Sequence, residues 1–111
     1  MKVIIIGLGL IGGSIALNLD ITDIILGMDT NPEILNKAIS GGYIDGIATD
    51  DDLTDADLVV VTTPVDCILR DLSSILDKIS DQTMVIELGS TKKLICESVA
   101  NHPKRTNLIS A

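Results

Sequence analysis

Short apolar runs alternate with amphipathic segments along the chain. The apolar runs, many of them β-branched, predict strands buried on both faces of a sheet, at positions 3–6, 24–28, 58–62, 84–88 and from 107 to 109. Apolar residues at helical spacing predict helices at positions 11–20, 32–40, 68–79 and 94–99. Strands that alternate with helices of this length favour right-handed crossovers and a parallel sheet.

The second predicted helix has clear signals at both ends. The segment Asn31–Glu33 places an N-cap residue, a proline suited to the first helical position and a first-turn acid in that order. Gly41 and Gly42 are expected to end the helix. Beyond the Asp45-Gly46 turn, a weaker pattern predicts a short edge strand at positions 47–49. The buried stripe of the helix is predicted to consist of Ile34, Leu35, Ala38 and Ile39.

The composition fits one folded domain, residues 1–111, with an unusual core. Of the 111 residues 46% are apolar, but the chain has neither Phe nor Trp and only one Tyr, so the core must consist of Ile, Leu and Val. A net charge of -8 would repel nucleic-acid phosphates and anionic lipids. No apolar stretch reaches the length of a membrane span, and no signal-peptide cleavage motif is evident. We therefore expect a cytoplasmic protein that binds neither nucleic acid nor membranes.

Three features that could suggest other chemistry have simpler structural explanations. Cys67 and Cys96 have neither zinc spacing nor the density of a disulfide scaffold, so two reduced, half-buried thiols are expected. The aspartates at positions 50–57 lack the Gly and terminal Glu of a calcium loop, which favours a solvated loop and no metal site. His102, the only histidine, is predicted to be a surface-loop residue at the amino ends of the strands.

A glycine-rich motif follows the first predicted strand directly. Gly7-Leu8-Gly9-Leu10-Ile11-Gly12 has the G-x-G-x-x-G spacing, between a strand and a helix, that binds dinucleotides. Gly7 would permit the tight turn, Gly9 would let the backbone approach a pyrophosphate, and Gly12 would let the helix pack close to the strand. A purely structural turn is the alternative, but three glycines at this spacing are conformationally costly without a ligand.

Asp29 gives an independent indication of the same ligand. It follows the second predicted strand, 17 positions after Gly12, where dinucleotide-binding folds place the acid that binds the adenosine ribose. Its carboxylate would accept hydrogen bonds from ribose hydroxyls and repel a 2′-phosphate, and neither Thr30 nor Asn31 supplies an arginine. NAD is therefore favoured over NADP. The alternative, that Asp29 only caps the next helix, is weaker because Asn31 fits that position better.

Two further segments are expected at the carboxyl edge of the sheet, where such folds bind their ligands. Thr62 and Thr63 leave the fourth strand, and Pro64 biases Thr63 towards an extended conformation that would form a wall of the cleft. Ser90 leaves the strand at 84–88 and can project into the cleft, or serve as an N-cap. The predicted fold is a Rossmann-type, doubly wound, mostly parallel sheet with helices on both faces.

Taken together, the motifs resemble the amino-terminal domain of prephenate dehydrogenases over essentially the whole chain. The resemblance is carried by residues 7–14, Asp29, Thr63-Pro64-Val65 and Gly89-Ser90-Thr91-Lys92; the family commonly has Asp where Glu87 stands. It implies NAD-dependent oxidative decarboxylation of prephenate to 4-hydroxyphenylpyruvate in tyrosine biosynthesis, with arogenate as a possible alternative substrate.

The resemblance also implies residue roles. The loop from Gly7 to Gly12, with Leu8, Leu10 and Ile11, would hold the pyrophosphate. Thr63 and Pro64, with Thr62 beside them, would flank the nicotinamide side. Ser90 would face the ring hydroxyl of the substrate or the catalytic histidine.

In the family, a strand like that at 107–111 is followed at once by a His-Pro pair with the catalytic histidine. A helical domain then completes the prephenate site and forms a homodimer. The chain is therefore expected to be a fragment that binds cofactor but does not turn over prephenate. Two alternatives stay open: the NAD(P)-binding domain of a 3-hydroxyacid dehydrogenase or imine reductase, and a standalone dinucleotide-sensing module.

Overall fold

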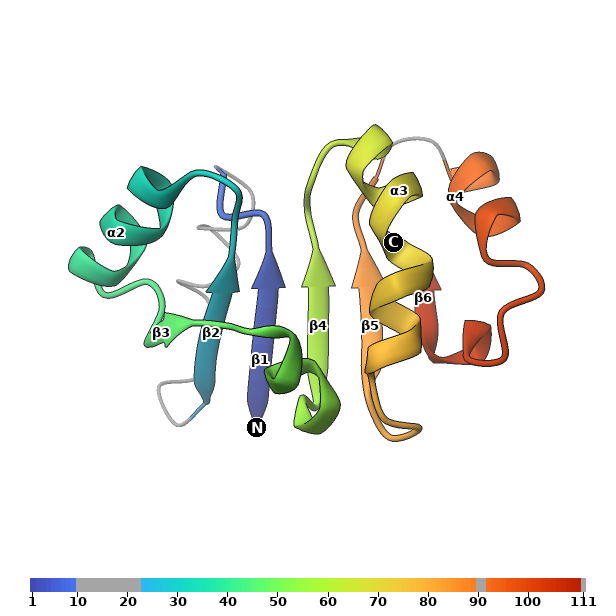
Figure 1. The fold of residues 1–111 in the computed structure, drawn as a ribbon, viewed down its shortest axis with the longest axis horizontal. Coiled ribbons are helices and arrows are strands. Elements are labelled where there is room, and N and C mark those ends of the chain that lie inside the picture. The colour runs from blue at the N-terminus through green and yellow to red at the C-terminus, as the bar shows by residue number, and fades with distance from the viewer. Residues whose placement is uncertain (10–22, 90–91, 111) are drawn as a thin grey trace.

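The computed structural model describes residues 1–9, 23–89 and 92–110. Within these ranges, six strands form one sheet in the order β3-β2-β1-β4-β5-β6, and every neighbouring pair is parallel. The strand bounds are β1 Lys2–Ile6, β2 Ile24–Met28, β3 Gly46–Ile47, β4 Leu58–Val61, β5 Met84–Glu87 and β6 Leu108–Ser110. Figure 1 shows all the longer strands pointing the same way. The prediction of a doubly wound parallel sheet is confirmed.

Helices cover both faces of the sheet. The described helices are α2 (Pro32–Ser40), α3 (Val65–Lys78) and α4 (Lys92–Ser98), with two 3-10 helices, η1 (Asp50–Asp55) and η2 (Arg105–Asn107). Successive side chains of β1 point to opposite faces: Ile4 belongs to the core cluster that includes α3 and α4, while Val3 and Ile5 belong to the cluster that includes α2. Because both faces are buried, the central strands read as continuous apolar runs. Figure 1 shows α3 crossing one face in front of β5.

The predicted ends of α2 are confirmed, but its predicted buried stripe is too wide. The Asn31 side chain accepts a hydrogen bond from the Glu33 N–H at 3.0 Å, and Gly42 beyond the helix has a φ of +74°. Ile39, predicted to be buried, is 41% exposed. At about 100° per residue it lies on the border of the stripe centred on Leu35 and Ala38, where α2 turns towards solvent.

The boundaries of β3 and α3 differ from the sequence prediction. The edge strand β3 is Gly46–Ile47 rather than 47–49, because Thr49 instead forms a capping box with Asp52 at the start of η1. Helix α3 begins at Val65, one turn before the first apolar residue of its predicted range. The first predicted helix, the site residues Leu10, Ile11, Gly12 and Ser90, and Ala111 lie outside the described residues.

The acidic segment is a 3-10 helix held to neighbouring lysines. Lys2 Nζ lies 3.0 Å from Asp52 Oδ1 and 2.5 Å from Asp55 Oδ1, and Lys78 Nζ lies 2.9 Å from Asp50 Oδ2. In the described parts of the chain, no group of three or more His, Cys, Asp or Glu residues is placed to hold a metal ion.

His102 and Cys96 differ from their predicted environments. His102 lies in the α4–β6 connection as expected, but its side chain is only 9% exposed, and its Nε2 lies 2.6 Å from Asp77 Oδ1. Its Nδ1 accepts a hydrogen bond from the Lys104 N–H. The predicted loop position is confirmed, but the ring is largely covered and connects this loop to the end of α3. Neither Cys67 nor Cys96 forms a disulfide; Cys67 is half-buried as predicted, whereas Cys96 is exposed. The described ranges contain no helix that is both long and apolar enough to span a membrane.

Candidate functional site

The carboxyl ends of β1, β2 and β4 border a cleft of about 530 Å³. Parallel strands end at one edge of a sheet, so residues that are distant in sequence meet there. Six predicted site residues line this cleft, namely Gly7, Gly9, Asp29, Thr62, Thr63 and Pro64. The structure thus brings together residues from three separate segments.

The turn after β1 requires glycine at its first position. Gly7 has a φ of +93°, and a Cβ there would lie 2.9 Å from Thr63 Cγ2 and 3.0 Å from the Thr63 backbone nitrogen. The Gly7 N–H donates to the Met28 carbonyl at 2.8 Å, and the Thr62 hydroxyl donates to the Gly7 carbonyl. Gly7 therefore lets the chain turn closely against both β2 and the Thr62-Thr63 segment.

Gly9 differs from Gly7, because nothing lies within 4 Å of the position its Cβ would take. The residue is exposed and lines the cleft. No contact within the described protein excludes a side chain at this position. The space beside it is open to a ligand.

Leu8 was predicted to contact the cofactor, but it does not line the cleft. It is 6% exposed and packs in the core cluster of α2. A Cβ on Gly27, in the middle of β2, would come within 2.4 Å of Leu8 Cδ1. Gly27 thus leaves room for the Leu8 side chain, which anchors the glycine turn to the sheet.

Asp29 links the glycine turn to the start of α2. Its Oδ2 accepts a hydrogen bond from the Leu8 N–H at 2.9 Å, and its Oδ1 accepts one from the Asn31 N–H at 2.9 Å. The N-cap of α2 is Asn31. Asp29 is half-buried and lines the cleft, so its carboxylate is oriented by two backbone groups at the ligand-facing edge.

Helix α3 contributes a cleft wall that the sequence analysis missed. Cys67, Arg70 and Asp71 line the cleft opposite Asp29, Thr30 and Ile34. The Arg70 Nε and Nη2 donate to the two Asp71 carboxylate oxygens at 2.9 Å and 3.0 Å. This hydrogen-bonded pair lowers the pKa of the Asp71 carboxyl below its usual value. No motif marked these residues, because only the packing of α3 brings them to the cleft.

A second turn, after β5, contains a fully buried carboxylate. Glu87 is 0% exposed. Its Oε2 accepts a hydrogen bond from the Gly89 N–H at 2.8 Å, and its Oε1 lies 3.0 Å from Lys92 Nζ. Glu87 therefore contacts the chain on both sides of positions 90–91, at Gly89 before them and at Lys92 after them.

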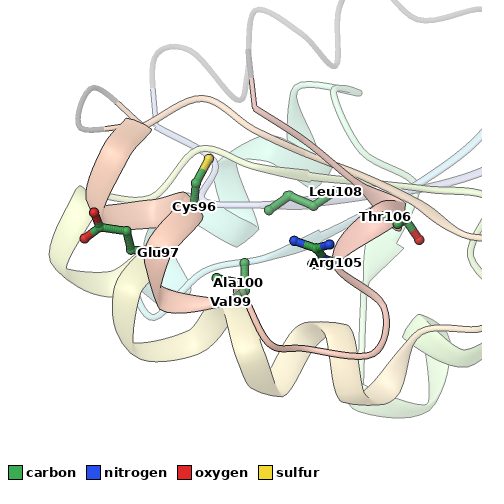
Figure 2. Close-up of a pocket in the computed structure, with 7 residues that line it drawn as sticks. All are labelled: Cys96, Glu97, Val99, Ala100, Arg105, Thr106 and Leu108. Atoms are coloured by element: carbon green, nitrogen blue, oxygen red, sulfur yellow. The ribbon is translucent and has the colours of Figure 1, made fainter.

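Another hollow, of about 440 Å³, lies between α4 and the η2–β6 segment (Figure 2). Cys96, Val99 and Ala100 lie on one side of it, and Arg105 and Leu108 on the other. It shares no lining residue with the cleft and contains no predicted site residue. The cleft at the carboxyl ends is therefore the candidate functional site.

Comparison with known families identifies the chain as a dehydrogenase domain. Residues 16–111 match the family model described as prephenate dehydrogenase, nucleotide-binding domain. The chain belongs to this family. The confirmed family assignment agrees with the resemblance seen in the sequence motifs.

One solved structure, at 30% identity, supports the assignment, and another, at 24% identity, shares the fold. A prephenate dehydrogenase from A. aeolicus, in complex with hydroxyphenyl propionate and NAD+, is 30% identical with a TM-score of 0.76, over 99% of this chain and 40% of that one. An arogenate dehydrogenase from Synechocystis is 24% identical with a TM-score of 0.76, over 88% of this chain and 37% of that one. The chain spans about two fifths of the length of these two dehydrogenases.

The fold itself is more widely shared. A 3-hydroxyisobutyrate dehydrogenase from Mycobacterium tuberculosis has a TM-score of 0.78 at 17% identity, over 98% of this chain and 38% of that one. At this identity the likeness is one of fold alone. The family match favours the prephenate dehydrogenases over the hydroxyacid alternative.

Proposed function

We propose that the chain binds NAD in the cleft, as the cofactor domain of an enzyme that oxidatively decarboxylates prephenate or arogenate. The observation that carries this proposal is the oriented Asp29 carboxylate beside the open position at Gly9. A carboxylate recognises ribose hydroxyls, and an unobstructed glycine admits a pyrophosphate close to the backbone. The two lie in one cleft.

Each end of the dinucleotide then has its own set of residues. The loop from Gly7 to Gly12 would hold the pyrophosphate, and Asp29 would accept hydrogen bonds from the adenosine ribose. Thr63 and Pro64, on the β4 side of the cleft, would flank the nicotinamide. Asp29 would also repel a 2′-phosphate, which favours NAD over NADP.

When bound, the nicotinamide supplies the hydride acceptor, and loss of carbon dioxide accompanies aromatisation of the substrate ring. Catalysis also needs a base within hydrogen-bond reach of the substrate hydroxyl. His102 lies in the α4–β6 connection, before β6, and is occupied by Asp77. We therefore propose that the base, and the helical domain that forms a homodimer, belong to the full-length enzyme, with Ser90 facing the substrate hydroxyl or that base.

Calorimetric titration with NAD+ and NADP+ tests the cofactor proposal. NAD+ should bind more tightly, and Asp29→Ala should narrow the difference by removing both the ribose hydrogen bonds and the repulsion of the 2′-phosphate. Gly9→Val should abolish binding while leaving the unfolding free energy nearly unchanged, because nothing lies within 4 Å of its Cβ position. Normal NAD+ binding by Gly9→Val would mean that the loop is only a structural turn.

The same chain should not turn over prephenate. NADH absorbance, followed with saturating prephenate and NAD+, should remain flat although NAD+ binds, because in this proposal the base and the second wall that positions the substrate belong to the full-length enzyme. Sustained turnover by the 111-residue chain would show that the catalytic group lies within it.

A further inference from the structure

The cleft extends beyond Asp29 to the amino-terminal half of α3. Cys67, Arg70 and Asp71 are spaced three and four residues apart and therefore share one face of that helix, and all three line the cleft. A second hollow of about 230 Å³ shares Ile6, Met28 and Asp71 with the cleft lining. Arg70 and Asp29 therefore line one cleft, and Asp71 also borders the neighbouring hollow.

The Arg70 guanidinium is held in a defined plane at this end of the cleft. Its Nε and Nη2 engage both oxygens of Asp71, a two-point contact that fixes the orientation of the planar group. The pairing uses one edge of the guanidinium and leaves its flat faces available. The side chain is 65% exposed, so most of its surface is accessible to a ligand.

Among the described residues that line the cleft, Arg70 has the side chain best suited to stack on a flat ring. None of the lining residues that the structure describes is aromatic, and the whole chain has a single Tyr. Ile34, which begins the apolar stripe of α2, lines the same cleft from the side of Asp29. A planar cation and an aliphatic side chain are both good partners for the face of a purine.

We propose that Arg70 stacks on the adenine base of the bound dinucleotide. This inference rests on the proposed function, because Asp29 must hold the ribose that carries the base. The base then extends from that ribose towards α3, while the nicotinamide lies at Thr63 and Pro64. Arg70 contributes through the plane of its guanidinium, and Asp71 maintains that plane.

The experiment separates stacking from simple attraction between charges. Arg70→Lys keeps the positive charge but loses the planar group, and Arg105→Lys is the matched control in the hollow beside η2. Calorimetry should show that Arg70→Lys weakens binding of NAD+ and of ADP-ribose by about five- to tenfold. Arg105→Lys should leave both affinities unchanged. Full affinity in Arg70→Lys would overturn the proposal, because charge alone would then account for any role of Arg70.

A direct readout of the contact comes from NMR of the complex saturated with NAD+. Nuclear Overhauser effects should connect the adenine H2 or H8 proton with Arg70 and with the Ile34 methyl groups. Their absence in the saturated complex would overturn the proposal. If the wild-type chain bound neither NAD+ nor ADP-ribose, both the proposed function and the role of Arg70 would be wrong. If the wild-type chain bound NAD+ and Arg70→Lys bound it equally well, only the role of Arg70 would be wrong.

Discussion

The turns after β1 and β5 are built alike but used differently. Each has a glycine whose Cβ would collide with its neighbours, and each has a carboxylate that accepts a backbone N–H of its turn: Asp29 from Leu8, and Glu87 from Gly89. Asp29 is half-buried at the edge of an open cleft. Glu87 is fully buried and paired with Lys92.

The difference indicates how the same arrangement, a carboxylate that accepts a backbone N–H of a turn, can serve either stability or binding. A buried carboxylate needs a compensating cation, because desolvation of an unpaired charge is costly. Solvent reaches the Asp29 carboxylate, so it needs no lysine and can keep lone pairs for a ligand. The Glu87 carboxylate is therefore expected to matter mainly for stability, and the Asp29 carboxylate for both the fold and binding.

The largest expected effect is a difference in stability between variants of the two glycines in the turn after β1. Gly7→Ala should lower the free energy of unfolding by about 3 kcal/mol, because the left-handed φ and the contact with the Thr63 backbone both oppose a side chain. Gly9→Ala, the matched control, should change it by less than about 0.5 kcal/mol. Urea unfolding followed by circular dichroism measures both. Equal stability of the two variants would contradict the steric role assigned to Gly7.

Replacing the buried carboxylate should have the next largest effect. Glu87→Gln keeps the shape but removes the charge that pairs with Lys92, and it should destabilise the chain by about 2 kcal/mol. Lys92 is 37% exposed, so water compensates part of the loss. NAD+ affinity, measured in the same variant under conditions where it is folded, should change little. A larger loss of affinity than of stability would place Glu87 in the binding machinery.

Asp29→Asn should give the opposite result, a larger loss of NAD+ affinity than of stability. One of the two backbone donors, Leu8 or Asn31, would face an amide NH₂ instead of an oxygen, at a cost of about 1 kcal/mol in unfolding free energy. Affinity for NAD+ should fall about tenfold, because the ribose hydroxyls lose a charged acceptor. Urea unfolding and calorimetry on one preparation test both parts. Unchanged affinity would remove Asp29 from the proposed site.

The smallest expected effect is on thermal stability and depends on pH. It concerns Asp52, at the opposite edge of the sheet. The hydrogen bond from the Thr49 N–H, then the contact with Lys2, lowers the pKa of Asp52 from its ordinary value of 3.8. Its contribution to stability is therefore fully present above that value and is lost as the pH falls through the lower, folded-state pKa. Asp52→Asn should melt slightly below the wild type at neutral pH, and the difference should vanish in strong acid. A difference that persisted there would exclude ionisation as its cause.

The sequence predicted those features that depend on local spacing. The β-branched runs gave β1, β2, β4 and β5 within about a residue, and the position of Asp29 after the second run placed it at the cleft. Arg70 could not be predicted, since its arrival at the cleft depends on how α3 packs across the sheet. The exposure of Ile39 has a similar cause, because periodicity defines a stripe but not how much of it the sheet covers.

The two hydrogen bonds that Asp29 makes to backbone N–H groups have a thermodynamic consequence. They restrict the side-chain torsions before any ligand arrives, so binding does not have to immobilise this side chain, a step that otherwise costs about 0.5–1.5 kcal/mol. Each carboxylate oxygen has a further lone pair, so a ribose hydroxyl can be added without breaking either bond. The cofactor would therefore meet a carboxylate that is already oriented, and affinity at this position would be set by hydrogen bonding rather than by conformational entropy.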